Sequence, residues 1–116
     1  MAYLKKFAGP IELEIGNGQI RKFAGPVEYQ YDYRSFKKFA GPILYLFDDE
    51  NIREFAGPVF MKFDGRYIRE FAGPILYEIK DNTIRKFAGP IEYQIDGYMR
   101  HEDWMALIIY LFVLNN

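Results

Sequence analysis

The tetrapeptide Phe-Ala-Gly-Pro recurs six times, and each copy begins 16 residues after the previous one. The copies begin at Phe7, Phe23, Phe39, Phe55, Phe71 and Phe87. No insertion interrupts the spacing, so the repeat divides one domain, residues 1–116, into units 3–18, 19–34, 35–50, 51–66, 67–82 and 83–98. Self-similarity at a fixed period is typical of folds that use one structural unit repeatedly. Such regularity indicates that one hairpin was copied, either by recent amplification or by deliberate engineering.

Each unit contains two short runs of β-branched and aromatic residues that alternate with two turn signals. In the sixth unit the runs are 84–87 and 91–95, with Ala-Gly-Pro between them and Asp-Gly after them. Asp-Gly and similar pairs supply the positive-φ positions of tight hairpins, and proline is tolerated at the first residue of a strand. The six units therefore predict twelve antiparallel strands.

Two strand registers follow from matching the side chains of each unit. Across the turn at Gly16-Asn17-Gly18, which corresponds to Asp-Gly in the sixth unit, Ile15 lies opposite Ile20; across the Phe-Ala-Gly-Pro turn, Phe7 lies opposite Ile11. Both hold only if the first strand of each unit carries a β-bulge at its charged pair, as at Arg21. With this bulge, five apolar positions of each unit face inward; in the third unit they are Phe36, Phe39, Ile43, Tyr45 and Phe47.

A meander of twelve strands has two free edges unless it closes into a barrel. A barrel of this size has a radius of about 12 Å, so its own side chains leave the centre unfilled. The segment Trp104–Leu114 is apolar on every side and follows acidic residues, which suits a buried helix at about 102–114. We therefore expect an all-β fold, a closed 12-stranded meander barrel with its C-terminal helix as a central plug.

Three other arrangements fit less well. A thirteenth strand at the C-terminus would expose half of the apolar run and spoil antiparallel closure. A solenoid would stack like charges in one ladder. A β-propeller requires about four strands per blade, whereas each unit here supplies two.

Twelve strands around a hydrophobic C-terminal helix resemble the tubby C-terminal domain and the phospholipid scramblases. The strand count and the final helix of this sequence carry the resemblance, and no functional residue transfers with it. The resemblance implies binding of anionic lipid or phosphoinositide as an alternative function.

The composition contains little that points to catalysis. The chain has no cysteine, one histidine (His101) and a net charge of −1. It lacks the basic excess of a nucleic-acid-binding domain, and it contains no sequence motif of a known catalytic or phosphate-binding site. Aspartates recur in the turns, where they suit the turn geometry. We expect no enzymatic activity, no cofactor, no metal site and no nucleic-acid partner.

The N-terminus has no signal peptide, the chain has no transmembrane segment, and it has no cysteine. From these features we expect a soluble, cytoplasmic protein.

Two surface features are candidate binding sites. One is an apolar patch on one side of the barrel. In units three to five, Leu44, Phe60 and Leu76 replace an outward glutamate of the other units, and Leu46 lies adjacent to Leu44. Clustered exposed apolar residues mark interaction surfaces, so we expect self-association or a protein partner there, and a structural or protein-interaction role. The other is a ring of cations that suits anionic headgroups: Lys5, Arg21, Lys37, Arg53, Arg69 and Arg85.

Overall fold

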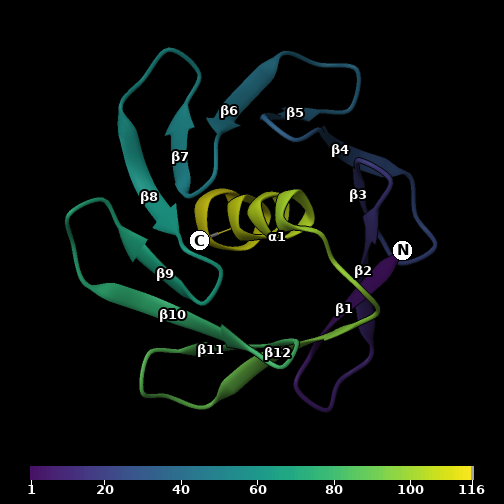
Figure 1. Ribbon diagram of the computed structural model, residues 1–116. Coiled ribbons are helices and arrows are strands. Elements are labelled where there is room, and N and C mark those ends of the chain that lie inside the picture. The colour runs from purple at the N-terminus through teal and green to yellow at the C-terminus, as the bar shows by residue number, and fades with distance from the viewer. Residues whose placement is uncertain (116) are drawn as a thin grey trace.

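A computed structural model describes residues 1–115 of the chain. It is a closed barrel of twelve antiparallel strands in which each strand pairs with its neighbours in sequence and β1 pairs with β12 (Figure 1). The strands are β1 (Ala2–Lys6), β2 (Ile11–Gly16), β3 (Gln19–Lys22), β4 (Val27–Tyr31), β5 (Ser35–Lys38), β6 (Ile43–Phe47), β7 (Asn51–Glu54), β8 (Val59–Phe63), β9 (Tyr67–Glu70), β10 (Ile75–Lys80), β11 (Thr83–Lys86) and β12 (Ile91–Asp96). The predicted meander barrel is confirmed.

The C-terminal segment is helical and lies inside the barrel (Figure 1). It begins as the α-helix α1 (His101–Ile108) and continues as the π-helical segment η1 (Ile109–Leu114). Residues 105–109 are fully buried. They lie within a layer of six first-strand side chains that are also fully buried: Leu4, Ile20, Phe36, Ile52, Ile68 and Ile84. Within residues 1–115, a central helix and no thirteenth strand therefore fills the barrel.

The six Phe-Ala-Gly-Pro turns lie at the periphery of the molecule, around the central helix (Figure 1). In the first of these turns the backbone N–H of Gly9 donates to the carbonyl oxygen of Lys6 at 2.8 Å. Ala8 has a φ of 59°, in the left-handed region that alanine seldom adopts. The same conformation recurs at the alanine of every copy, which shows that the turn geometry repeats with the sequence: Ala24, Ala40, Ala56, Ala72 and Ala88.

The register across the Gly16-Asn17-Gly18 turn is as predicted, because Ile15 lies opposite Ile20 and Glu14 lies opposite Arg21. The register across the Phe-Ala-Gly-Pro turns also shifts by one residue in all six units, as a bulge requires. However, the residue without a partner lies on the second strand of each unit and not in the charged pair of the first. These six residues are Glu12, Glu28, Leu44, Phe60, Leu76 and Glu92.

This shift corrects the predicted inward face. Lys5 pairs with Ile11, so the predicted pairing of Phe7 with Ile11 is wrong. Phe36 and Phe47 are buried as expected and Tyr45 is half-buried, but Phe39 is 53% exposed and Ile43 is 39% exposed. The physical reason is that the phenylalanine backbone bonds to the neighbouring unit, as the N–H of Phe39 does to the carbonyl oxygen of Glu28 at 3.0 Å.

The described part of the chain contains no helix that is long and apolar enough to cross a membrane.

Candidate binding surface at the Phe-Ala-Gly-Pro end of the barrel

The barrel has two chemically different ends. We call the end with the six Phe-Ala-Gly-Pro turns the FAGP end, and the end with the aspartate-containing turns the aspartate end. The helix begins at the aspartate end, where the ring of His101 contacts the carbonyl oxygen of Asp49, and it ends at the FAGP end, where Phe112 lies near Phe71. The two ends must therefore be assessed separately as candidate sites.

The phenylalanines of the FAGP turns form a ring of six exposed aromatic side chains, which we call the Phe ring. Their exposed fractions lie between 53% and 58%. Three of them contact the unit before: Phe23 lies edgewise 6.4 Å from the ring of Tyr3, Phe87 lies 6.3 Å from the ring of Tyr67, and the Lys62 ammonium lies 5.5 Å from the ring of Phe71. Sequence reasoning missed this ring because it placed the register shift on the wrong strand.

Beside the second and third Phe-ring positions, a polar side chain of the previous unit accepts a hydrogen bond from the backbone N–H of the turn alanine. Glu14 accepts from the backbone N–H of Ala24 at 3.3 Å and from the Arg21 guanidinium at 3.0 Å. The Ala24 N–H holds the pKa of Glu14 below its usual range; burial opposes this and Arg21 adds to it. Gln30 accepts from Ala40 in the same way. The wall that carries the Phe ring is therefore anchored by hydrogen bonds between units.

The predicted ring of cations lies on this wall, but only part of it is paired. Lys5 lies 3.5 Å from Asp96, and Arg21 pairs with Glu14. Glu78, which lies opposite Arg85 across β10 and β11, pairs instead with Arg66 at 2.9 Å. Within residues 1–115, no ion pair joins the other four members of the ring: Lys37, Arg53, Arg69 and Arg85.

The unpaired second-strand residues divide the FAGP end into a charged side and an apolar side. On the charged side, three lysine–glutamate pairs at 3.7–3.9 Å bridge the turns: Lys6–Glu12, Lys22–Glu28 and Lys86–Glu92. On the apolar side, the equivalents of these glutamates are the half-buried Leu44, Phe60 and Leu76. Leu46, the fourth predicted patch residue, lies in the strand opposite Arg53 and is also half-buried.

Tyrosines form a layer between this end and the core. The hydroxyl of Tyr110 lies 3.5 Å from a carboxylate oxygen of Glu28. Burial and the nearby Glu28 raise the pKa of Tyr110, and burial together with Glu92 raises the pKa of Tyr77 and Tyr93. These phenols therefore stay protonated at neutral pH, and the Tyr110 hydroxyl donates to Glu28.

A cavity of about 610 Å³ opens on the apolar side, between units four and five and the end of the helix. Its lining includes Phe60, Leu76 and Phe112, and Glu70 is its charged member. Tyr77 stacks on Phe112 with ring centroids 4.0 Å apart, and this stacked pair forms the inner wall of the cavity, toward the core. The patch residues Phe60 and Leu76 thus line a cavity as well as the surface.

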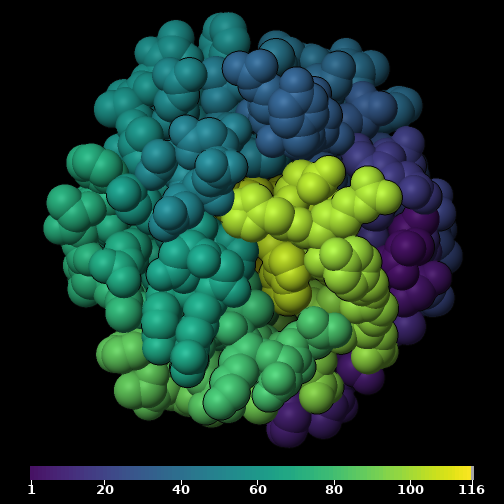
Figure 2. All heavy atoms as spheres, viewed as in Figure 1, coloured from purple at the N-terminus to yellow at the C-terminus, as the bar shows by residue number. Residues whose placement is uncertain are grey.

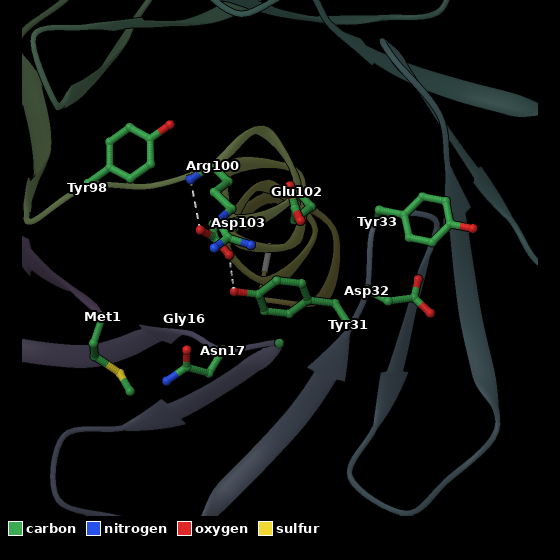
Figure 3. A pocket seen from close by; sticks show the side chains of 11 residues that line it. Met1, Gly16, Asn17, Tyr31, Asp32, Tyr33, Tyr98, Arg100, Glu102 and Asp103 are labelled. Carbon is green, nitrogen blue, oxygen red and sulfur yellow. Dashed lines mark hydrogen bonds between the residues drawn. The ribbon is translucent and has the colours of Figure 1, made fainter.

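The aspartate end contains a more polar cavity of about 430 Å³ beside the start of the helix (Figure 3). Figure 2 shows the start of the helix at the centre of this face, surrounded by the repeats. The buried carboxylate of Asp103 accepts from the Tyr31 hydroxyl at 2.5 Å and from the Arg100 backbone N–H at 2.8 Å. Both oxygens of Asp103 have partners, so this carboxylate caps the helix and holds it to the wall.

His101 and the turn aspartates at this end also have structural partners. His101 stacks on Phe63 with ring centroids 5.8 Å apart. Asp32 accepts from the backbone N–H groups of Arg34 and Ser35 at 2.8 and 2.7 Å; partial burial opposes but does not outweigh these bonds, which lower the pKa of Asp32. Among residues 1–115, no three carboxylate, histidine or cysteine side chains gather closely enough to hold a metal ion.

The FAGP end is therefore the strongest candidate for a binding surface. Comparisons with protein-family models, curated proteins and solved structures found no match to this chain.

Proposed function

We propose that the protein is a non-enzymatic interaction module that docks onto protein through its FAGP end. The observation that carries this proposal is the Phe ring, in which six aromatic side chains are each more than half exposed at one end of the barrel. The six side chains lie on separate turns around the barrel (Figure 1), and aromatic side chains are enriched in the energetically dominant positions of interfaces. The apolar side of the same end enlarges this surface.

A second copy of the chain is the partner that the charges of this end favour. The units follow one another around the barrel, so units four and five lie across from units one and two. Exposed Glu54 and Glu70 occupy the turn position that holds lysine in the other units, such as Lys6 and Lys86. In a two-fold, face-to-face pair, Glu54 can lie over Lys6 of the other copy while Glu70 lies over Lys86. Such a dimer would cover both Phe rings.

Sedimentation velocity over a concentration series tests this proposal. We expect a concentration-dependent dimer that the Phe7→Ser, Phe55→Ser double variant weakens at least tenfold, with an unchanged circular dichroism spectrum. The Glu54→Lys, Glu70→Lys variant should weaken it as well. The matched control is Glu50→Lys, which changes an exposed carboxylate at the aspartate end and should leave the dimer intact. A wild-type chain that stays monomeric up to about 1 mM, where binding is worth only about 4 kcal/mol, contradicts self-association.

A second candidate function is binding to an anionic membrane surface, in keeping with the resemblance to tubby and scramblase barrels. The observation that favours it is that Lys37, Arg53 and Arg69 have no ion partner within residues 1–115 and lie beside the exposed Phe ring. Cations beside aromatic side chains suit the headgroup region of an anionic bilayer.

Flotation with anionic and neutral liposomes, at low and moderate salt, tests the membrane candidate. Salt-sensitive flotation with anionic liposomes alone, weakened by Arg53→Gln and Arg69→Gln together, supports it. Flotation that is absent or independent of lipid charge contradicts it.

A further inference from the structure

The cavity on the apolar side of the FAGP end is where the sequence departs most from its own repeat. The lysine–glutamate pair of units one, two and six is replaced in units four and five at both positions. Phe60 and Leu76 stand where those three units have the glutamate, and Glu54 and Glu70 stand where they have the lysine. These paired changes remove the charge from the cavity wall and reverse the charge at its rim.

The wall of this cavity is apolar and firmly held. Phe60 packs against the core and lies 5.9 Å from the ring of Tyr45, and Met61 is buried. Tyr77 and Phe112 stack at the inner end. A volume of about 610 Å³ falls within the range of sites that hold small organic ligands. The cavity can therefore receive an aliphatic chain without rearrangement of the barrel.

Glu70 is the charged residue of the cavity lining, and the Lys62 ammonium lies outside that lining, 5.5 Å from the ring of the lining residue Phe71. Neither Glu70 nor Glu54 forms an ion pair within residues 1–115. The helix also ends here, with no basic residue in its last turn. The carbonyl groups of a helix C-terminus carry partial negative charge that favours a nearby cation. An apolar cavity with this rim suits a ligand that joins an aliphatic chain to a cationic head.

We propose that this cavity binds a small cationic amphiphile of the alkylammonium class, with the chain between Phe60, Leu76 and Phe112 and the ammonium at Glu70. The proposal does not rest on the docking function, since one ligand can bind to a monomer, although the cavity shares Glu70 and Phe71 with the surface proposed to dimerise. A negative result in the dimerisation or flotation experiment does not contradict the ligand proposal, and a negative result in the ligand titration does not contradict the docking proposal.

Isothermal titration with three ligands of equal chain length tests the charge preference. The ligands are decyltrimethylammonium, decyl sulfate and decyl maltoside, each below its micelle-forming concentration. We expect the ammonium compound to bind to the full-length protein at a stoichiometry of one and at least tenfold more tightly than the sulfate. Equal affinities for the two charged ligands, or no binding below the micelle-forming concentration, would overturn the proposal.

Variants locate the site. Glu70→Gln should weaken ammonium binding about three- to fivefold, as expected for a solvent-exposed charge pair, and should leave maltoside binding unchanged. Glu50→Gln at the aspartate end is the matched control and should change neither. Leu76→Trp and, independently, Val113→Trp should fill the cavity and weaken every ligand at least tenfold; circular dichroism identifies which of them folds. Binding that survives a folded tryptophan variant excludes this cavity as the site.

Discussion

At the scale of single residues, the position after each Ile or Val that follows a FAGP turn determines the chemistry of one end of the barrel. This residue has no partner across the turn, and its backbone carbonyl instead accepts from the turn phenylalanine of the next unit, as Glu12 does from Phe23. Units one, two and six use glutamate there and pair it with lysine, whereas units three to five use Leu44, Phe60 and Leu76. One substitution per unit therefore changes a charged rim into an apolar one while the fold stays the same.

The hydrogen bond between Tyr31 and Asp103 yields the first prediction. Tyr31→Phe should lower the free energy of unfolding by about 1–3 kcal/mol at pH 8, because the buried Asp103 carboxylate loses one of its donors. Tyr98→Phe is the control, since Tyr98 is 82% exposed and should change stability little. Urea titrations of the two variants and the wild type measure the effect, and equal midpoints for all three would contradict it.

The same tyrosine adds a dependence on pH. Burial, followed by the hydrogen bond to Asp103, raises the pKa of Tyr31 above its ordinary value of about 10. A raised folded-state pKa contributes stability that is complete below pH 10 and is lost as the pH rises above it, because the unfolded chain releases the phenolic proton first. The wild type should therefore lose more stability than Tyr31→Phe between pH 8 and pH 11. A larger loss in the variant would contradict the assignment.

At the scale of elements, the helix holds the barrel together. No element other than α1 and η1 occupies the centre in residues 1–115, and Met105, Leu107 and Ile109 are fully buried. The first strands contribute only four or five residues each, so their inward side chains are too few to fill the interior. The strands and the helix therefore depend on each other for burial.

Leu107→Ala tests this dependence. Loss of this fully buried side chain should lower the free energy of unfolding by about 2–5 kcal/mol, because a cavity forms that a closed barrel cannot collapse to fill. Ile43→Ala is the control, since Ile43 lies on the outer wall with 39% exposure and should cost much less. Thermal unfolding followed by circular dichroism compares the two, and a control that is as destabilised as Leu107→Ala would show that the helix is not the centre of stability.

At the scale of the whole molecule, the barrel closes where β1 pairs with β12. Two glycines at equivalent turn positions, one at this seam and one away from it, distinguish the effect of barrel closure on stability from the effect of turn conformation. Gly97 and Gly65 have φ values of 105° and 100°. A Cβ at Gly97 would lie 2.9 Å from the Met1 carbonyl oxygen at this seam, whereas a Cβ at Gly65 would have no neighbour within 4 Å. The strain of a positive φ is therefore common to both sites, and the contact across the seam is present at only one.

Gly97→Ala should consequently destabilise the protein more than Gly65→Ala, by about 1–2 kcal/mol in the free energy of unfolding, a typical cost of local overpacking. Urea titration of both single variants measures the difference. Equal losses would mean that the two termini of the sheet are not held in close contact.

The candidate site was only partly predictable. The 16-residue spacing locates the apolar substitutions at Leu44, Phe60 and Leu76, since a departure from a repeat is visible without a structure. The Phe ring was not predictable in the same way, because a phenylalanine among β-formers is ordinarily a core residue. The cavity beside Phe112 depends on where the helix ends relative to units four and five, which the repeat does not encode.

By itself, the sequence determined the strands, the turns, the closed meander and the central helix. These follow from side-chain alternation, turn chemistry and an apolar tail, all of which are local in the chain. Tertiary structure alone decided which way the turn phenylalanines face. That choice depends on a hydrogen bond between neighbouring units, such as that from the N–H of Phe23 to the carbonyl oxygen of Glu12 at 2.9 Å. A bond of this kind forms only once the barrel brings the end of one strand beside the next unit, and it turns an apparent core residue into a surface one.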